Sequence, residues 1–171
     1  MLLEKQLQKD KATIVKEWFD MVVGTYPADT SQFLKKQKDP FANPVGNTIL
    51  KGLEALFQEL LNGLNQESVE SFLDPIIRIR AVQQFTPSQA VGFISYLKSV
   101  IRKRYEKQLD DSENAKALLQ FELKIDSLYF IAFNIYMQCR ETIYRIQANE
   151  EKNSTLKAMK RAGLLNDNEN P

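Results

Sequence analysis

Apolar residues recur along most of the chain at the spacing of an α-helix. Near the N-terminus this spacing holds for Leu3, Leu7, Ile14, Trp18 and Val22, and charged side chains occupy the intervening positions. The pattern predicts one amphipathic helix that ends near Gly24. Because no segment alternates apolar and polar residues at the period of a β-strand, we expect an all-α protein.

Further helices follow from the same periodicity. We expect a long connection over residues 25–48 with one helical turn at 31–36, and a strong helix whose apolar pattern runs over 45–64. A short helix should end at Pro75, because an internal proline removes a hydrogen bond, and another brief helix should follow it. The sequence thus predicts a helical bundle of five main helices plus one or two short ones.

A capping box marks one helix start. In the run Thr86-Pro87-Ser88-Gln89, the threonine and glutamine side chains can each bond the other's backbone amide, and Pro87 suits the first helical position. We expect this helix to run to about Lys107. The final helix should begin at Asp110 or Asp111 and extend to about Asn149.

The final helix is apolar almost all round between residues 128 and 137, which is typical of an interior helix or of one shared with a second subunit. After it the composition becomes polar. We therefore expect a helical domain over 1–149 and a polar tail over 150–171. The tail carries a short amphipathic segment that either frays or docks on a partner, with Leu156, Met159, Leu164 and Leu165 as its apolar residues.

Composition excludes several classes of function. The chain contains no histidine, which removes histidine triads, the common zinc motifs and a histidine-ligated haem, and no glycine-rich phosphate loop is present. We expect no catalytic activity, no metal and no cofactor. The net charge of +1 does not favour nucleic acid, and the longest apolar run is too short to span a membrane. A cytoplasmic location is expected.

Two arginines lie in an unusually apolar stretch. Arg78 and Arg80 point about 200° apart on a helix, so both cannot face water if the neighbouring isoleucines are buried. One arginine must lie at an interface, where it pairs with a carboxylate such as Asp74, Glu122 or Asp126, or else receives a ligand or a partner. Our candidate contact residues are Arg78, Arg80, Gln83 and Gln84.

Aromatic residues suggest an alternative function. An apolar pocket between the final helix and its neighbours could be lined by Phe93, Tyr129, Phe133 and Tyr136, in which case the protein binds an apolar or anionic small molecule. Aromatics in such a pattern more often form plain core. Cys139 is expected to be a buried small hydrophobe.

Two stretches resemble a known family. The runs DPFANPVGNTILKGLEALFQELLNG at 39–63 and LDPIIRIRAVQQFTPSQAVGFISYLKSVIR at 73–102 are similar to the N-terminal domain family of the RsbT co-antagonist RsbRD. The resemblance extends from about Asp10 to Arg145. It implies a globin-like, haem-free sensor domain of stressosome proteins, often dimeric, and here a stand-alone member without the STAS output domain.

A stand-alone sensor domain would act through contact with another protein. We therefore expect a non-catalytic sensor or adaptor module, a homodimer, linked to stress or redox regulation. The resemblance also implies an anaerobic bacterium as source, and a regulatory protein or a redox complex as partner.

Overall fold

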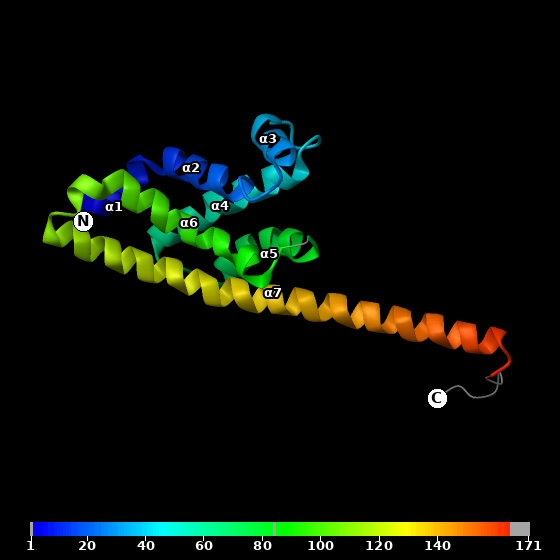
Figure 1. Cartoon of the computed structure of the whole chain (residues 1–171). Coiled ribbons are helices and arrows are strands. Elements are labelled where there is room, and N and C mark those ends of the chain that lie inside the picture. The colour runs from blue at the N-terminus through cyan, green and yellow to red at the C-terminus, as the bar shows by residue number, and fades with distance from the viewer. Residues whose placement is uncertain (1, 84, 165–171) are drawn as a thin grey trace. The chain divides into compact units, whose positions relative to one another are not determined.

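The computed structural model describes residues 2–83 and 85–164 of the 171-residue chain (Figure 1). Within these ranges the chain is all-α, as predicted, and contains seven α-helices and one 3-10 helix. Their bounds are α1 Leu2–Lys9, α2 Lys11–Val23, α3 Ala28–Lys36, α4 Pro44–Asn62, α5 Gln66–Val82, α6 Pro87–Tyr105, η1 Glu106–Gln108 and α7 Ser112–Arg161. In the described part, no helix combines the length and hydropathy that crossing a bilayer requires. Two compact units are present, Met1–Tyr136 and Met137–Pro171.

The core of the first unit is built on α2, α4, α5 and α6. Helix α4 packs against α5 and α2, and α2 also packs against α6 (Figure 1). Trp18 of α2 is fully buried, and its Nε1 donates a hydrogen bond to the carbonyl oxygen of Phe93 in α6 at 2.8 Å. The two rings stack with their centres 6.5 Å apart. This contact fixes α2 against α6 near the middle of the core.

Helices α4 and α5 approach each other closely at Gly52. A methyl group at this position would lie 2.7 Å from Cδ1 of Ile76 and 3.2 Å from the carbonyl oxygen of Phe72. The absence of a side chain therefore sets the distance between these two helices. Gly63, with φ of 117°, then ends α4 in the left-handed conformation that glycine tolerates best.

Several predicted helix boundaries are confirmed. The capping box at Thr86 and Gln89 is present with both hydrogen bonds, and α6 begins at Pro87. Asp111 caps α7, since its carboxylate accepts from the backbone N–H of Asn114 at 3.2 Å. Local side-chain chemistry determines these ends, which is why they could be identified from sequence.

The prediction of one helix from Leu3 to Gly24 was wrong. The chain turns at Asp10 and forms α1 and α2 instead. The Asp10 carboxylate accepts from the hydroxyl of Tyr105 at 2.9 Å, and its Oδ2 lies 3.9 Å from Nη1 of Arg104. Both partners lie at the end of α6, so the break coincides with a contact between residues far apart in sequence.

The expected break at Pro75 was also wrong, because α5 continues through it. Leu73, Ile76 and Ile77, which flank the proline, are all fully buried. Their packing compensates for the hydrogen bond that proline removes, so tertiary contacts override the local preference.

Two further helices are longer than the sequence indicated. Helix α3 starts at Ala28 rather than at residue 31, and α7 extends to Arg161 rather than to about Asn149. Residues 150–161, expected to lie in a polar tail, are therefore helical. The sequence suggested only a separate short amphipathic segment here, with Leu156 and Met159, because the polar residues before it interrupt the apolar period of the helix.

Candidate functional site

The most unusual side chain in the described structure is Arg80, in the last turn of α5. It is 1% exposed and is one of the largest fully buried side chains. Its Nε donates to the carbonyl oxygen of Ala90 at 3.1 Å, and its Nη2 donates to that of Gln89 at 3.0 Å. The guanidinium also lies 3.3 to 3.4 Å from Oγ1 of Thr25. Arg80 therefore ties the end of α5 to the first turn of α6 and to the end of α2.

Three aromatic rings surround the same guanidinium. Its carbon atom lies 4.1 Å from the ring centre of Phe85, 5.6 Å from that of Phe93 and 5.7 Å from that of Tyr26. Tyr26 and Phe85 contact each other edge to face, with centres 5.3 Å apart. Cation–π attraction to these rings offsets part of the cost of burying the charge. We call Arg80 with Thr25, Tyr26, Phe85 and Phe93 the Arg80 cluster.

Burial changes the acidity of two groups in the Arg80 cluster. Loss of hydration lowers the pKa of Arg80 below its ordinary value, and the side chain still carries its charge at neutral pH because that ordinary value is so high. Burial likewise raises the pKa of Tyr26 above 10.0, while the charge on Arg80 opposes this change. Tyr26 is therefore a neutral hydroxyl that donates to Oε1 of Gln83 at 2.9 Å.

The two arginines of the apolar stretch are placed differently. Arg78 is exposed and forms an ion pair with Asp74 one turn earlier, at 2.6 Å. Arg80 is the interface residue, as the helical geometry required, but it contacts none of the predicted carboxylates. Asp126 pairs with Lys98, and Glu122 pairs with Arg102. At 1% exposure, Arg80 is out of reach of a protein partner in this state.

A cavity of about 480 Å³ lies beside the Arg80 cluster. It is lined by Thr25, Tyr26, Pro27, Thr30, Gln83, Phe85 and Gln89. Gln83, a predicted contact residue, is thus part of its wall. Gln84, the other predicted glutamine, lies outside the described residues.

A second cavity, of about 500 Å³, lies between α2, α3 and the start of α4. Its floor includes Val15, Phe19, Leu34 and Leu50, and its rim carries Lys16, Lys35, Lys38, Asp20 and Glu54. Buried Asn43 forms part of the wall, and its amide donates to the carbonyl oxygens of Leu34 and Gln37. Because all three lysines are exposed, their charges are well solvated.

The four aromatics proposed to line a pocket are differently exposed. Phe93 and Tyr136 are buried, Tyr129 is half-buried, and Phe133 is 49% exposed. Neither cavity described above is lined by any of them. Phe93 instead lies between Trp18 and Arg80 in the core.

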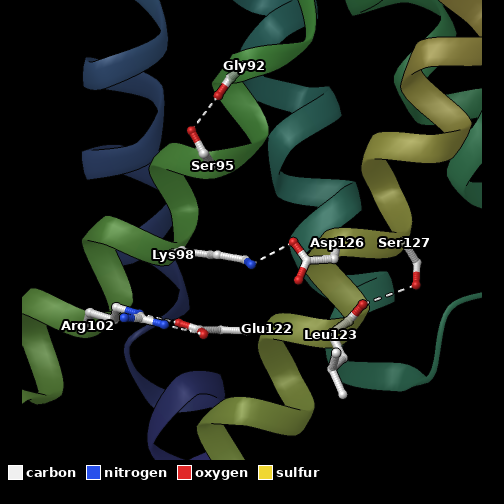
Figure 2. A network of polar contacts seen from close by, with 8 residues as sticks. All are labelled: Gly92, Ser95, Lys98, Arg102, Glu122, Leu123, Asp126 and Ser127. Carbon is white, nitrogen blue, oxygen red and sulfur yellow. Dashed lines mark hydrogen bonds and ion pairs between the residues drawn. The ribbon is translucent and has the colours of Figure 1, made fainter.

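Two ion pairs join α6 to α7. Glu122 and Asp126, one turn apart on α7, point toward Arg102 and Lys98 on α6 (Figure 2). The Arg102–Glu122 pair is bidentate, at 2.5 and 2.6 Å, and the Glu122 side chain is only 5% exposed. Hydrogen bonding to Glu122 raises the pKa of Arg102. Two pairs one turn apart fix the register of α7 along α6.

Arg104, near the end of α6, has a structural role as well. Arg104 pairs with Glu17 of α2 and approaches Asp10. The basic residues Arg102 and Arg104 at this end of α6 are therefore paired with carboxylates.

Helix α7 carries exposed apolar residues on the side opposite its buried face. Its buried face within the first unit consists of Leu118, Phe121, Ile125, Leu128, Ala132 and Ile135. On the other side Leu119, Leu123, Phe130 and Phe133 are 49 to 74% exposed. At 100° per residue these four, which we call the α7 row, fall within about 80° of arc. Sequence reasoning noted that this helix is apolar all round but did not single out the row, although its spacing of four, seven and three residues was readable.

Residues of the second unit are mostly exposed. Every residue from 144 to 164 is exposed, including the predicted docking residues Leu156, Met159 and Leu164. Leu165, the fourth of these, lies outside the described residues. Cys139 is buried, as expected for a small hydrophobe. Among the described residues no group of histidine, cysteine, aspartate or glutamate could hold a metal ion.

One comparison with known proteins identifies a family. The family profile described as "RsbT co-antagonist protein rsbRD N-terminal domain" matches residues 12–151. This range covers most of the chain and includes α2 except its first residue, α3 to α6, and most of α7. No curated protein and no solved structure matches the chain.

Proposed function

Because this chain belongs to the family of RsbT co-antagonist protein rsbRD N-terminal domains, a family of regulatory sensor domains, we propose that it passes a signal by contact with another protein. The module is non-catalytic and cytoplasmic in this proposal. The observation that carries it is the exposed α7 row, which gives the domain a surface for such a contact.

The α7 row suits a partner helix. Its spacings of four, seven and three residues are multiples of the three-and-four pattern that lets side chains of two helices interlock. Asp126, which pairs with Lys98, lies in the seven-residue interval. Phe130 is 74% exposed, and Leu119 and Leu123 are 56% and 52% exposed. Aromatic and aliphatic side chains concentrated on one stripe are typical of an interaction surface rather than of a surface that faces only water.

We propose that the partner helix is α7 of a second copy, so that the protein is a homodimer. A two-fold pair presents the same row from both sides and needs no other complementary surface. The second unit supports this reading, because residues 144–161 form a helix whose side chains are all exposed. Most of the stability of a helix in a protein comes from packing of one of its faces, so a partner would stabilise this segment.

Sedimentation equilibrium tests the proposal. The wild-type protein should be a dimer, and Phe130→Glu should be a monomer because a carboxylate in the centre of the row cannot be desolvated without a partner. Gln120→Glu is the matched control, since it adds the same charge at an exposed position of α7 outside the row. A wild-type monomer, or a Phe130→Glu dimer, would contradict dimerisation through this row.

Contact with a different protein needs a second measurement. Wild-type and Phe130→Glu proteins should be used as baits in affinity purification from the source organism, with Gln120→Glu as control. We expect one set of partners to be lost with Phe130→Glu alone. Identical recoveries from all three baits would place the signalling contact elsewhere.

A further inference from the structure

The Arg80 cluster contains a positive charge that no carboxylate balances in the part of the chain that the structure describes. Its hydrogen-bond partners are two carbonyl oxygens and one hydroxyl. These neutral groups and the three rings solvate the guanidinium but leave its full charge in place. Other cations between the helices of this protein, such as Arg102 and Lys98, do have carboxylate partners. Lys11 and Lys124 also bond neutral oxygens across helices, but both are only half-buried. Arg80 differs from them because its charge is fully buried, so an anion nearby would balance it.

The cavity beside Arg80 provides the space for one. Of its lining residues, Thr25, Tyr26, Phe85 and Gln89 also contact the Arg80 guanidinium. A single layer of side chains thus separates the buried charge from the cavity. Because Arg80 itself is buried, the protein between it and the cavity screens its charge less than bulk water would, so the charge attracts an anion placed there.

Polar groups of the cavity can bind the anion directly. Gln83 accepts from Tyr26 through Oε1, which leaves its side-chain NH₂ as a donor at the cavity wall. Thr30 contributes a hydroxyl group to the same wall. Tyr26, Pro27 and Phe85 supply apolar surface beside these donors. Such a mixture suits a ligand with one charged end and an apolar body.

We propose that this cavity is a binding site for a small organic carboxylate. The charge of a single carboxylate matches the single cation behind the wall, whereas no lysine or other arginine lines the cavity to balance a second negative charge. The carboxylate lies against the amide of Gln83 and the hydroxyl of Thr30. Its apolar body packs on Tyr26 and Phe85. The site is independent of the α7 row, since none of the row lines it.

Benzoate and benzamide form the probe pair that tests the charge. They have nearly the same shape, and only benzoate is negative. Each probe is added to the ¹⁵N-labelled protein up to a probe concentration of about 10 mM, and binding is followed by NMR. This range detects dissociation constants in the millimolar range, which correspond to weak binding. We expect benzoate to shift the amide resonances of Thr30, Gln83 and Phe85, and to bind at least about tenfold more tightly than benzamide, a difference of about 1.4 kcal/mol. Equal affinities for the two probes, or no shifts at these residues, would overturn the proposal.

Variants locate the site. Gln83→Leu keeps the Arg80 charge and removes the donor amide, and it should weaken benzoate binding about threefold to tenfold. Arg80→Met should abolish the preference for benzoate over benzamide. If Arg80→Met fails to fold, Gln83→Leu decides alone. Lys38→Gln, on the rim of the second cavity, is the control and should bind benzoate like the wild type. Loss of binding with Lys38→Gln but not with Gln83→Leu would assign benzoate to the second cavity and overturn the proposal.

Discussion

The guanidinium carbon of Arg80 lies 4.1 Å from the centre of the Phe85 ring, and the arginine is 1% exposed. A charged side chain is thus a central packing element where α5, α6 and the end of α2 meet. Its long stem and planar head fill space that an aliphatic residue would fill in most helical cores. The packing of this region consequently depends on the same residue as the carboxylate binding that we propose.

Arg80→Met should destabilise the protein by about 1 to 3 kcal/mol, because methionine fills much of the volume but cannot donate to the carbonyl oxygens or attract the rings as a cation. Urea unfolding followed by circular dichroism measures this change. Arg78→Met is the matched control, since Arg78 is exposed and makes a surface ion pair, and it should change stability by less than about 0.5 kcal/mol. Equal effects of the two substitutions would show that the Arg80 cluster contributes no net stability.

The two glycines Gly52 and Gly92 should respond in opposite directions to alanine. Alanine in a helix is favoured over glycine by about 1 kcal/mol, and a methyl group at Gly92 would meet no atom within 4 Å. Gly92→Ala should therefore stabilise the protein. At Gly52 the methyl group would collide with Ile76 and the backbone of Phe72, so Gly52→Ala should cost about 1 to 3 kcal/mol. Thermal unfolding of both variants tests the prediction, and stabilisation by Gly52→Ala would contradict the close helix approach.

The Arg102–Glu122 ion pair should show measurable coupling. Its Glu122 end is 5% exposed, but the Arg102 side chain is 62% exposed, so solvent screens part of the attraction. A double-mutant cycle with Arg102→Met and Glu122→Gln should give a coupling energy of about 0.5 to 2 kcal/mol. The corresponding cycle for Arg78 and Asp74, an exposed pair, should give less than about 0.5 kcal/mol. If the coupling energy of Arg102 and Glu122 is no larger than that of Arg78 and Asp74, the Arg102–Glu122 pair does not hold α7 on α6.

Stability should fall in alkali partly because of Tyr105. Burial raises the pKa of Tyr105 above its ordinary 10.0, the hydrogen bond to Asp10 raises it further, and Arg104 opposes both. As pH rises through about 10, the unfolded chain loses this proton while the folded protein keeps it. The free energy of unfolding therefore decreases between the unfolded and folded pKa values.

Tyr105→Phe tests this contribution. The variant loses the hydrogen bond to Asp10 and should be less stable at pH 7, yet its stability should decline less steeply above about pH 10 than that of the wild type. Tyr144→Phe, at a position 56% exposed, should keep the wild-type slope. If the free energy of unfolding of Tyr105→Phe falls with pH as steeply as that of the wild type, groups other than Tyr105 cause the loss of stability in alkali.

The helical class and several helix ends were readable from the sequence, because they depend on side chains close together along the chain. The box of Thr86 and Gln89 and the cap at Asp111 are examples. The geometry of a single helix was also enough to predict that one of Arg78 and Arg80 lies at an interface. The sequence did not predict which of the two arginines is buried or which groups the buried arginine contacts.

By itself the sequence determined an all-α protein without histidine chemistry, because periodicity and composition are local properties. Only the tertiary structure decided that the helix continues through Pro75, that the first helix breaks at Asp10, and that Thr25, Tyr26 and Phe93 meet at Arg80. Each of these outcomes depends on contacts between residues far apart in the chain. The free energy of such contacts outweighs the local preferences of the chain, but the contacts cannot be recognised from a short stretch of sequence.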